Sequence, residues 1–217
     1  MVPGIYQYEL ARFFGFKKHQ ILFPQYSADV NLFNGFYHQR KAVLKDKKDI
    51  LFVGRLDKIK GIRYLTDAFL ELDATGQFDL NLIIIGSGPE KINIPVHPRI
   101  RQYDFLDQKI IVSMLENVRF FCLPSLKEPW GVVLHEFAAA GMPIVATNIC
   151  GAATAFVKPY YNGLLIMPAQ TNSLKKAMLY MASLDKKRLE EMGTRSYELS
   201  RQITPAMWSS TLLGIIS

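Results

Sequence analysis

Short runs of apolar residues that end in glycine constrain the fold of this chain most. Residues 50–53 read ILFV before Gly54, and residues 80–85 read LNLIII before Gly86. Hydrophobic residues at successive positions suit strands that are covered on both faces, as in a parallel sheet. Between the two runs, apolar residues recur at helical spacing over residues 60–72. Strands that alternate with helices predict right-handed βαβ crossovers, and therefore a doubly wound, Rossmann-like parallel α/β sheet.

The same alternation continues toward the carboxyl terminus. We expect further strands at residues 100–103, 118–124, 143–147 and 163–167, and helices at 108–116, at 130–140, in SLKKAMLYMASL, in KKRLEEMGTRSYELSRQ and in AMWSSTLLGIIS. The first 48 residues are less regular: we expect a short helix in YQYELARFF, a strand in ILFPQY and a loop in NLFNGF. The predicted organisation is a leading segment at 1–48, a regular domain at 49–200 and a carboxyl-terminal helix at 201–217.

Composition excludes several classes of protein. Hydrophobic residues make up 49% and charged residues 21%, which favours a sizeable core over disorder. The only two cysteines, Cys122 and Cys150, lie in apolar runs, which indicates a reducing compartment such as the cytoplasm. The sequence has no uncharged apolar stretch long enough to span a membrane and no secretory signal layout at its start. It also has no cluster of His, Cys and carboxylate residues at the spacing of metal ligands.

The charge balance leaves anionic partners open. The net charge is +7 and the pI is about 9.3, which suits anionic ligands, an anionic membrane surface or nucleic acid. The positive charges are scattered, with small clusters at 17–19 and 41–48 that are typical of a solvated surface.

Ligands of such sheets bind outside the carboxyl ends of the strands, so the loops that follow the strands hold the candidate residues. In the loop GRLDKIKG, Arg55 and Lys60 could converge on a diphosphate, or they could be ordinary surface cations. In GSGPEK, Gly86 and Gly88 do not continue into a dinucleotide fingerprint, because Lys91 takes the place of the third glycine. This turn either lets a ligand approach the backbone or simply ends a strand.

The stretch KEPWGVVLHE carries the strongest candidates. Pro129 suits the first position of a helix, which leaves the N–H groups of Trp130, Gly131, Val132 and Val133 without helical partners. A bare helix N-terminus is an anion site, and Gly131 would let a ligand approach its backbone.

Two glutamates flank this helix start. Glu128 and Glu136 are eight residues apart, which corresponds to about 12 Å and about 80° on a helix. That span suits a ligand with a phosphate in the middle and hydroxyl-bearing sugars at both ends, which is the layout of a nucleotide sugar. Alternatively, Glu128 favours the helix dipole and Glu136 reaches solvent. His135, beside Glu136, is a less favoured candidate for a catalytic base.

Four segments in this order carry a family resemblance: GRLDKIKG, IIIGSGP, LPSLKEPWGVVLHEFAAAGMPIVAT and YYNGLLI. Together they resemble the carboxyl-terminal, donor-binding half of a retaining GT-B glycosyltransferase of family 4, the glycosyl transferases group 1. The resemblance covers roughly residues 18–215, and FPQYSADVNLF resembles the interdomain entry of that family. The segment with the paired glutamates is its most specific part.

The resemblance implies a role for each matching residue. Arg55 and Lys60 would neutralise the donor diphosphate, and Glu128 would contact the transferred sugar near the reacting face; these are the expected catalytic groups. Glu136 would hold the ribose hydroxyls. The expected substrate-binding positions are completed by Gly131, Val132 and Val133 over the phosphates, Leu106 beside the base, and Gly86 and Gly88.

The implied reaction is transfer of a hexose from a nucleotide diphosphate sugar to a glycan or lipid-linked acceptor, with retention of configuration. Fixed cations and amides would meet the charge that builds on the leaving diphosphate, so neither metal nor cofactor is expected. One departure lies in the loop after residues 143–147, where Ala155 stands at a position that is often glutamate in the family.

The resemblance also implies a missing partner. Complete members have an amino-terminal acceptor domain, and residues 1–17 resemble only its tail, so we expect that domain or a partner subunit to complete the enzyme. We expect no nucleic acid, and we hypothesise peripheral contact with an anionic membrane. Two alternatives are a non-catalytic module that binds nucleotides or sugars and a dinucleotide oxidoreductase, which the broken GSGPEK turn disfavours. We also expect the face formed by the strand-end loops to expose apolar and basic side chains.

Overall fold

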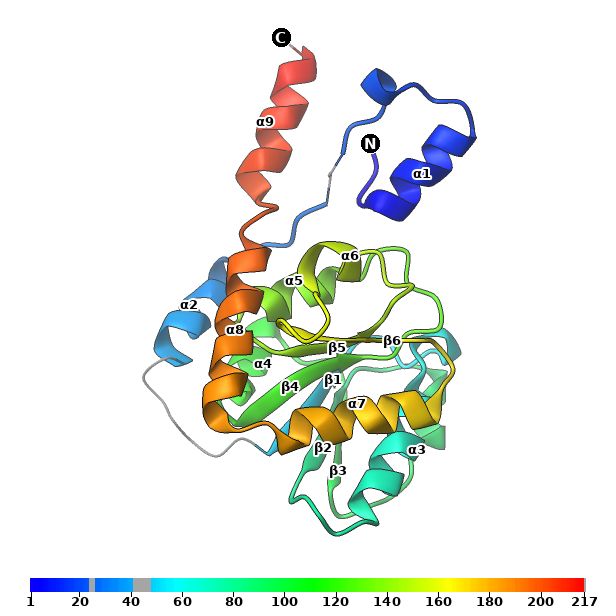
Figure 1. The fold of residues 1–217 in the computed structure, drawn as a ribbon, viewed down its shortest axis with the longest axis vertical. Helices are drawn as coiled ribbons and strands as arrows, with labels where there is room; N and C mark the ends of the chain where they lie inside the picture. Colours follow the sequence, from blue (N-terminus) through cyan, green and yellow to red (C-terminus); the bar gives the residue numbers. More distant parts are fainter. Residues whose placement is uncertain (24–25, 41–47, 217) are drawn as a thin grey trace.

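A six-stranded parallel sheet forms the centre of the molecule (Figure 1). The structure is a computed structural model that describes residues 1–23, 26–40 and 48–216. The strand order is β3-β2-β1-β4-β5-β6. The strands are β1 Asp49–Val53, β2 Asn81–Ile85, β3 Ile100–Tyr103, β4 Val118–Leu123, β5 Ile144–Thr147 and β6 Gly163–Ile166. The order reverses between β1 and β4, so the predicted doubly wound fold is confirmed.

Helices cover both faces of this sheet. Figure 1 shows α3 and α7 together on one face, and α2, α4, α5 and α8 on the other. The helices of the described residues are α1 Ile5–Phe13, α2 Asn31–Arg40, α3 Ile62–Asp73, α4 Gln108–Met114, α5 Val132–Ala139, α6 Ala153–Phe156, α7 Thr171–Ser183, α8 Lys186–Ser200 and α9 Pro205–Ile216. Short 3-10 helices lie at η1 Lys18–Gln20, η2 Lys58–Lys60, η3 Pro89–Asn93 and η4 Leu115–Asn117.

The core lies where the central strands meet these helices. Most side chains of β1, β2, β4 and β5 are fully buried, and only Asp49, Val53, Asn81 and Arg119 are partly exposed. The ring of Phe121 on β4 stacks on Phe137 of α5 with centroids 4.1 Å apart. Full burial of one such ring stabilises the fold by about 1.5–3 kcal/mol. The all-apolar strands are therefore explained by burial on both faces, as the sequence indicates.

The leading segment contains the main correction to the predicted elements. NLFNGF, expected as a loop, belongs to helix α2. Phe33 and Phe36 are buried, and the Phe33 ring meets Phe137 of α5 edge-on at 5.9 Å. At the start of α2, the Asp29 carboxylate accepts a hydrogen bond from the N–H of Asn31 at 3.1 Å. Tertiary burial of the aromatic rings therefore outweighs the loop preference of the asparagines and the glycine.

Other expectations for the segments outside the central domain have mixed outcomes. The helices predicted in YQYELARFF and AMWSSTLLGIIS are present as α1 and α9, and Figure 1 shows both at the upper end of the molecule, beyond the sheet. No strand forms in the described part of ILFPQY, whose residues 24–25 lie outside the described residues. Most of the basic cluster at 41–48 also lies outside them. The divisions at 48/49 and 200/201 stay predictions.

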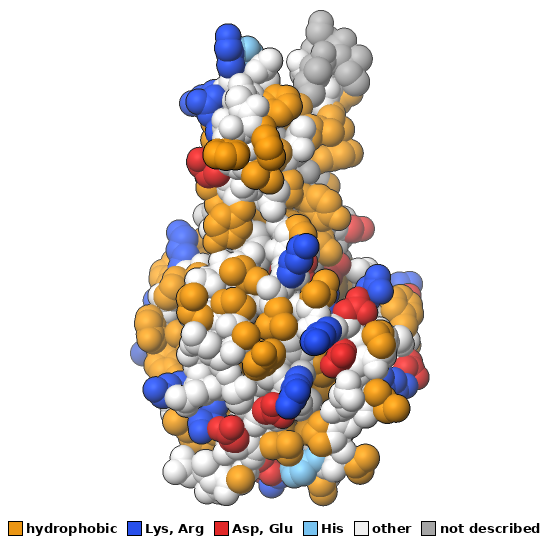
Figure 2. All heavy atoms as spheres, turned by 90° about the vertical axis from the view of Figure 1, so that its right-hand side faces the viewer, with side chains coloured by type: hydrophobic (Ala, Val, Ile, Leu, Met, Phe, Trp, Pro, Cys, Tyr) orange, Lys and Arg blue, Asp and Glu red, His pale blue; other side chains and the backbone are white. Residues whose placement is uncertain are grey.

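The carboxyl ends of the strands form one side of the molecule. Figure 2 shows this side, where hydrophobic side chains gather across the middle and Lys and Arg side chains lie next to them. The hydrophobic side chains agree with the expected apolar exposure, whereas Asp and Glu lie among the Lys and Arg side chains, so the expected basic excess stays a prediction. Within the described part of the chain, no helix is both long and apolar enough to cross a membrane.

Candidate functional site

Two of the loops at the carboxyl ends of the strands pack closely against each other. The loop after β1 contains η2, and the loop after β4 spans residues 124–131. The N–H of Leu126 donates to the carbonyl of Ile59 at 2.6 Å. Gly61 has φ +71, and a Cβ added to it would lie 2.2 Å from the carbonyl oxygen of Pro124. Glycine is needed at this position both for its backbone conformation and for the close approach of the two loops.

This packing brings Lys60 and Glu128 into contact. The Lys60 Nζ forms an ion pair with the Glu128 carboxylate. The two side chains are only 20% and 9% exposed, so both charges are largely withdrawn from water. The Ser125 hydroxyl lies 3.4 Å from the same carboxylate oxygen. Removal of either charge would leave the other uncompensated in a partly buried place, which is costly.

Helix α5 begins later than the sequence predicts. Its first residue is Val132, and its N-cap is Gly131 with φ +89, so Pro129 is not at the first helical position. The Trp130 carbonyl instead accepts the Ala152 N–H at 2.8 Å. Gly131 turns the chain into the helix in a left-handed conformation that other residues rarely adopt. In the first turn the N–H of Leu134 donates to the Gly131 carbonyl at 2.9 Å, so the N–H groups that helix geometry leaves without a helical partner are those of Gly131, Val132 and Val133.

The turn at Gly131 leaves no space for a side chain. A Cβ there would lie 2.8 Å from the Cys150 sulfur and 3.0 Å from Cγ of Glu128. The Cys150 thiol donates to the Trp130 carbonyl at 2.9 Å. Burial raises the pKa of the Cys150 thiol to about 12, and the Glu128 carboxylate adds to this increase. Cys150 is therefore an uncharged support of the loop, not a nucleophile.

Glu136 lies on α5 and points to a different neighbour. The Gln108 side-chain amide, at the start of α4, donates to its carboxylate at 2.9 Å. Burial raises the pKa of the Glu136 carboxyl, and the bond from Gln108 partly offsets this. A glutamate held in a partly buried place by an amide does not behave as a side chain that simply reaches into solvent.

Arg55 lies apart from the pair formed by Lys60 and Glu128. Its side chain is 79% exposed, and its Nε lies 3.0 Å from the Asp57 carboxylate. The hydrogen bonds and ion pairs of the described residues link neither Arg55 nor Glu136 to Lys60. The structure thus joins two of the four charged candidates directly and leaves the other two on separate partners.

The remaining candidates lie on neighbouring loops. A Cβ on Gly86 would lie 1.9 Å from the Gly54 carbonyl, and one on Gly88 would lie 2.5 Å from the Leu56 carbonyl. What approaches these glycines is therefore the chain's own backbone, which favours the plain strand-ending turn. Leu106 is partly buried against the core. Ligand binding by all three stays a prediction.

His135 serves as a structural residue. It is fully buried, its Nδ1 accepts from the Ala28 N–H at 3.1 Å, and its Nε2 lies 2.9 Å from the Ser200 carbonyl, to which it donates. The ring stacks on Phe156 with centroids 4.3 Å apart. Burial lowers the pKa of His135 despite the bond to Ser200. A neutral imidazole with both nitrogens engaged is not available as a base.

Sequence reasoning missed several supporting residues. Gln108 and Ser125 contact the two glutamates, but nothing in their sequence context distinguishes them from other polar residues. Gly151 could have been found from the sequence, because it is a glycine that follows a strand. Its N–H donates to the Glu128 carbonyl at 3.2 Å. Over the described ranges, no group of three or more His, Cys, Asp or Glu side chains could hold a metal ion.

Comparison with known proteins identifies the family of this sequence. The sequence model described as "Glycosyl transferases group 1" matches residues 34–199. An uncharacterized glycosyltransferase of Methanocaldococcus jannaschii is 28% identical over 85% of this chain and 51% of its own length. The alpha-D-kanosaminyltransferase of Streptomyces kanamyceticus is 26% identical over 79% of this chain and 44% of its own length. The chain thus spans about half the length of these curated relatives.

Solved structures share the fold. The sucrose-phosphate synthase of Thermosynechococcus elongatus superimposes with a TM-score of 0.77 at 21% identity, over 99% of this chain and 56% of that one. Anabaena HepE, solved in complex with UDP and glucose, has a TM-score of 0.75 at 16% identity, over 99% of this chain and 61% of that one. Likeness at this level of identity establishes the fold, and the family match covers most of the sequence. The chain therefore belongs to the glycosyl transferases group 1 family.

Proposed function

We propose that this chain is the donor-binding domain of a retaining glycosyltransferase that moves a hexose from a nucleotide diphosphate sugar to a glycan or lipid-linked acceptor. The observation that carries the proposal is the partly buried ion pair of Lys60 and Glu128 beside the bare start of α5. A cation, free amides and a carboxylate in one place suit a ligand that joins an anionic bridge to a polyhydroxyl ring.

The proposed roles follow from charge. Lys60 and the N–H groups of Val132 and Val133 would meet the diphosphate, where negative charge builds as the sugar leaves. Once Lys60 engages phosphate, the Glu128 carboxylate is released to accept sugar hydroxyls. Arg55 is exposed on the same loop as Lys60, so it can swing from Asp57 to a second phosphate oxygen. These fixed charges would do the work of a metal ion, so we propose a reaction without metal or cofactor.

Glu136 would bind the ribose. Its carboxylate already accepts a hydrogen bond from an amide donor, Gln108, as it would from vicinal hydroxyls. The pneumococcal O-GlcNAc transferase GtfA, which shares the fold with a TM-score of 0.73, was solved in complex with UDP and GlcNAc. A ligand of the same chemical class is what we propose for this site.

The proposal includes a partner. Because the chain spans about half the length of the curated relatives it matches, we propose that an acceptor-binding domain or subunit completes the active site. We also propose peripheral contact with an anionic membrane at the cytoplasmic surface, since Lys17 and Lys18 follow the exposed rings of Phe13, Phe14 and Phe16. Vesicle co-sedimentation checks the second point: binding that does not rise with anionic lipid content removes it.

Nucleotide titration tests the central proposal. We expect UDP, GDP or ADP, or a matching hexose conjugate, to bind the wild-type chain in calorimetry without added metal. Lys60→Ala and Glu136→Ala should each weaken binding by about tenfold or more, because each loses a charged hydrogen-bond partner. Lys187→Ala, an exposed cation on α8, is the matched control and should bind as the wild type does. If no nucleotide binds, or if all three variants bind equally, the donor-site proposal fails.

A further inference from the structure

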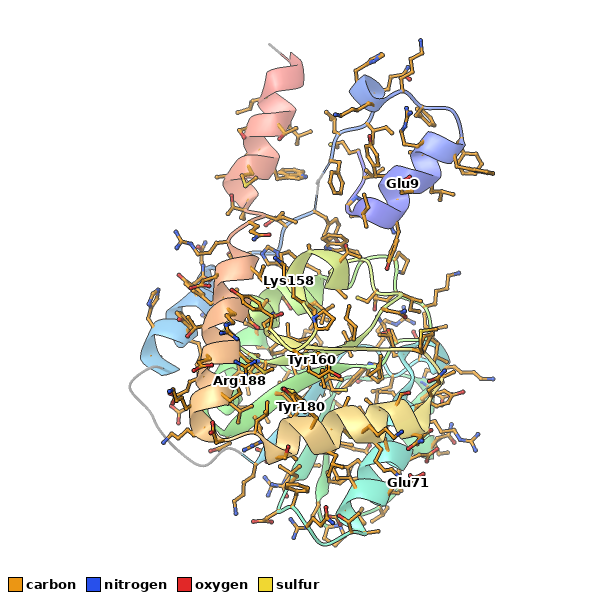
Figure 3. The ribbon with its side chains drawn as sticks, viewed as in Figure 1. Glu9, Glu71, Lys158, Tyr160, Tyr180 and Arg188 are labelled. Atoms are coloured by element: carbon orange, nitrogen blue, oxygen red, sulfur yellow. The ribbon has the colours of Figure 1, made fainter. Side chains whose placement is uncertain are left out.

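A groove lies between the edge strand β6 and helix α7, away from the pair formed by Lys60 and Glu128. Its volume is about 340 Å³. Its walls include Tyr160, Leu165, Met167, Lys176 and Tyr180, which define the β6–α7 groove. Figure 3 shows Tyr160 and Tyr180 close together, the first from the turn before β6 and the second from α7. Since Tyr160 precedes the strand and Met167 follows it, the groove extends along the whole of β6.

Tyr160 is held in an unusual backbone conformation. Its φ is +61, which is uncommon for a residue other than glycine. Its N–H donates to the Gly163 carbonyl at 2.8 Å, and its carbonyl accepts from Nη2 of Arg188 at 2.9 Å. The residue is nevertheless 61% exposed. Two hydrogen bonds thus maintain a strained turn that presents an aromatic ring to solvent, and such outliers gather at functional sites.

The lining of the groove suits an amphipathic ligand. The rings of Tyr160 and Tyr180 meet edge to face, at 89° with centroids 5.5 Å apart, so they form one aromatic pair in the wall of the groove. The polar residues in its lining are the two tyrosines, Ser173 and Lys176, and no Asp or Glu lines the groove. A pyranose ring has this same division, because its C–H face packs on aromatic rings while its hydroxyls need hydrogen-bond partners.

The edge of β6 is less suited to a peptide. A peptide strand would need free backbone groups along β6, but the Gly163 carbonyl already accepts from Tyr160. The strand has only four residues, and Pro159 precedes it in the turn. Short, partly blocked edges resist strand addition. The side-chain groove, rather than the backbone edge, is therefore the binding feature.

The Met167 end of the groove adjoins the loop after β5, which in turn contacts the loop that carries Glu128. The Asn148 amide contacts the Met167 sulfur at 3.2 Å. Asn148 opens the loop that continues to Gly151, whose N–H donates to the Glu128 carbonyl. A linear ligand that lies along β6 would thus point from the two tyrosines toward the loop that carries Glu128.

We propose that the β6–α7 groove binds a glycan chain, with the rings of Tyr160 and Tyr180 stacked on its sugars. The ligand class rests on the proposed function, since a glycan acceptor would be held beside the donor site by this groove. The contact itself needs no nucleotide and no transfer, so it can be tested separately from the donor site.

Saturation-transfer NMR on the full chain, without nucleotide, tests the proposal with linear tetrasaccharides of glucose and of N-acetylglucosamine as probes. We expect at least one probe to bind the wild-type chain, and Tyr160→Gly to weaken that binding about tenfold through loss of a stacking face. Glycine accepts the left-handed conformation, so relief of backbone strain offsets part of the lost contact with Tyr180, and the variant should remain folded at the temperature of the assay. Tyr180→Ala should show the same loss. Tyr161→Ala is the control, because Tyr161 is a neighbouring exposed tyrosine that packs under Arg195 outside the groove.

Loss of tetrasaccharide binding in Tyr160→Gly and Tyr180→Ala, with retention in Tyr161→Ala, supports the proposal. Failure of both probes to bind the wild-type chain overturns it, as does equal binding by Tyr160→Gly or equal loss in Tyr161→Ala. Calorimetry with the nucleotide that binds the wild type separates this result from the donor site, since the groove variants should bind that nucleotide normally. Glycan binding without any nucleotide binding would keep the groove and remove the proposed function.

Discussion

The two ends of the loop after β1 carry ion pairs of different kinds. At one end, Arg55 pairs with Asp57 two residues away, and its side chain is 79% exposed. At the other end, Lys60 pairs with Glu128 of a distant loop, and both side chains are largely buried. Exposed pairs contribute little to stability, whereas a buried pair ties its loops together and is costly to break. Of the two predicted cations, only Lys60 therefore has a structural role as well as the proposed binding role.

The substitution with the largest expected effect, Gly61→Ala, disrupts the contact between the two loops on which this difference depends. Gly61→Ala places a Cβ 2.2 Å from the Pro124 carbonyl and forces alanine to φ +71. We expect the free energy of unfolding, measured by urea titration, to fall by about 3 kcal/mol, the upper range for single substitutions. Gly76→Ala is the control: glycine there has φ +64 but nothing within 4 Å, so only backbone strain of about 1 kcal/mol should appear. Similar losses in the two variants would mean that the loops do not depend on this contact.

The next largest effect compares how much each of the two ion pairs contributes to the free energy of unfolding. Lys60→Ala leaves the Glu128 carboxylate partly buried without its partner, and we expect a loss of about 2 kcal/mol in the free energy of unfolding. Arg55→Ala should change it by less than about 0.5 kcal/mol, because that pair is exposed. Both variants should bind nucleotide diphosphates more weakly. Equal stability losses would contradict the structural distinction, and unchanged binding in Arg55→Ala would remove its proposed contact with phosphate.

The smallest effect concerns Glu136, whose pKa is raised by burial. Because the folded protein then holds a proton more tightly than the unfolded chain, the Glu136 contribution lowers stability as pH rises from the ordinary carboxyl pKa through the raised value. Glu136→Gln should flatten this part of the stability profile. Gln108→Ala removes the bond that lowers the pKa, so the decline should extend to higher pH. Urea unfolding across mildly acidic to neutral pH measures both, and a Gln108→Ala profile that matches the wild type would dismiss the role of Gln108.

Much of the fold is readable from the chain, because strands such as LNLIIIG and VRFFCLP are apolar at nearly every position wherever both faces are covered. The failures occurred where distant contacts decide local structure. Helix α2 forms because Phe33 and Phe36 find a place against α5, which the asparagines and glycine of NLFNGF do not foretell. Helix α5 begins at Val132, later than predicted, because Gly131 must turn beside Cys150 and Glu128.

By itself, the sequence determined the parallel α/β fold and the family, since hydrophobic periodicity and the spacing of glycines and glutamates are local properties of the chain. Only the tertiary structure decided which charged residues are partners. Lys60 meets Glu128 across 68 residues of sequence, whereas Arg55 turns to its neighbour Asp57 and Glu136 is held by Gln108. The physical reason is that an ion pair between loops depends on how closely their backbones pack, and at Gly61 that distance is set by a missing side chain.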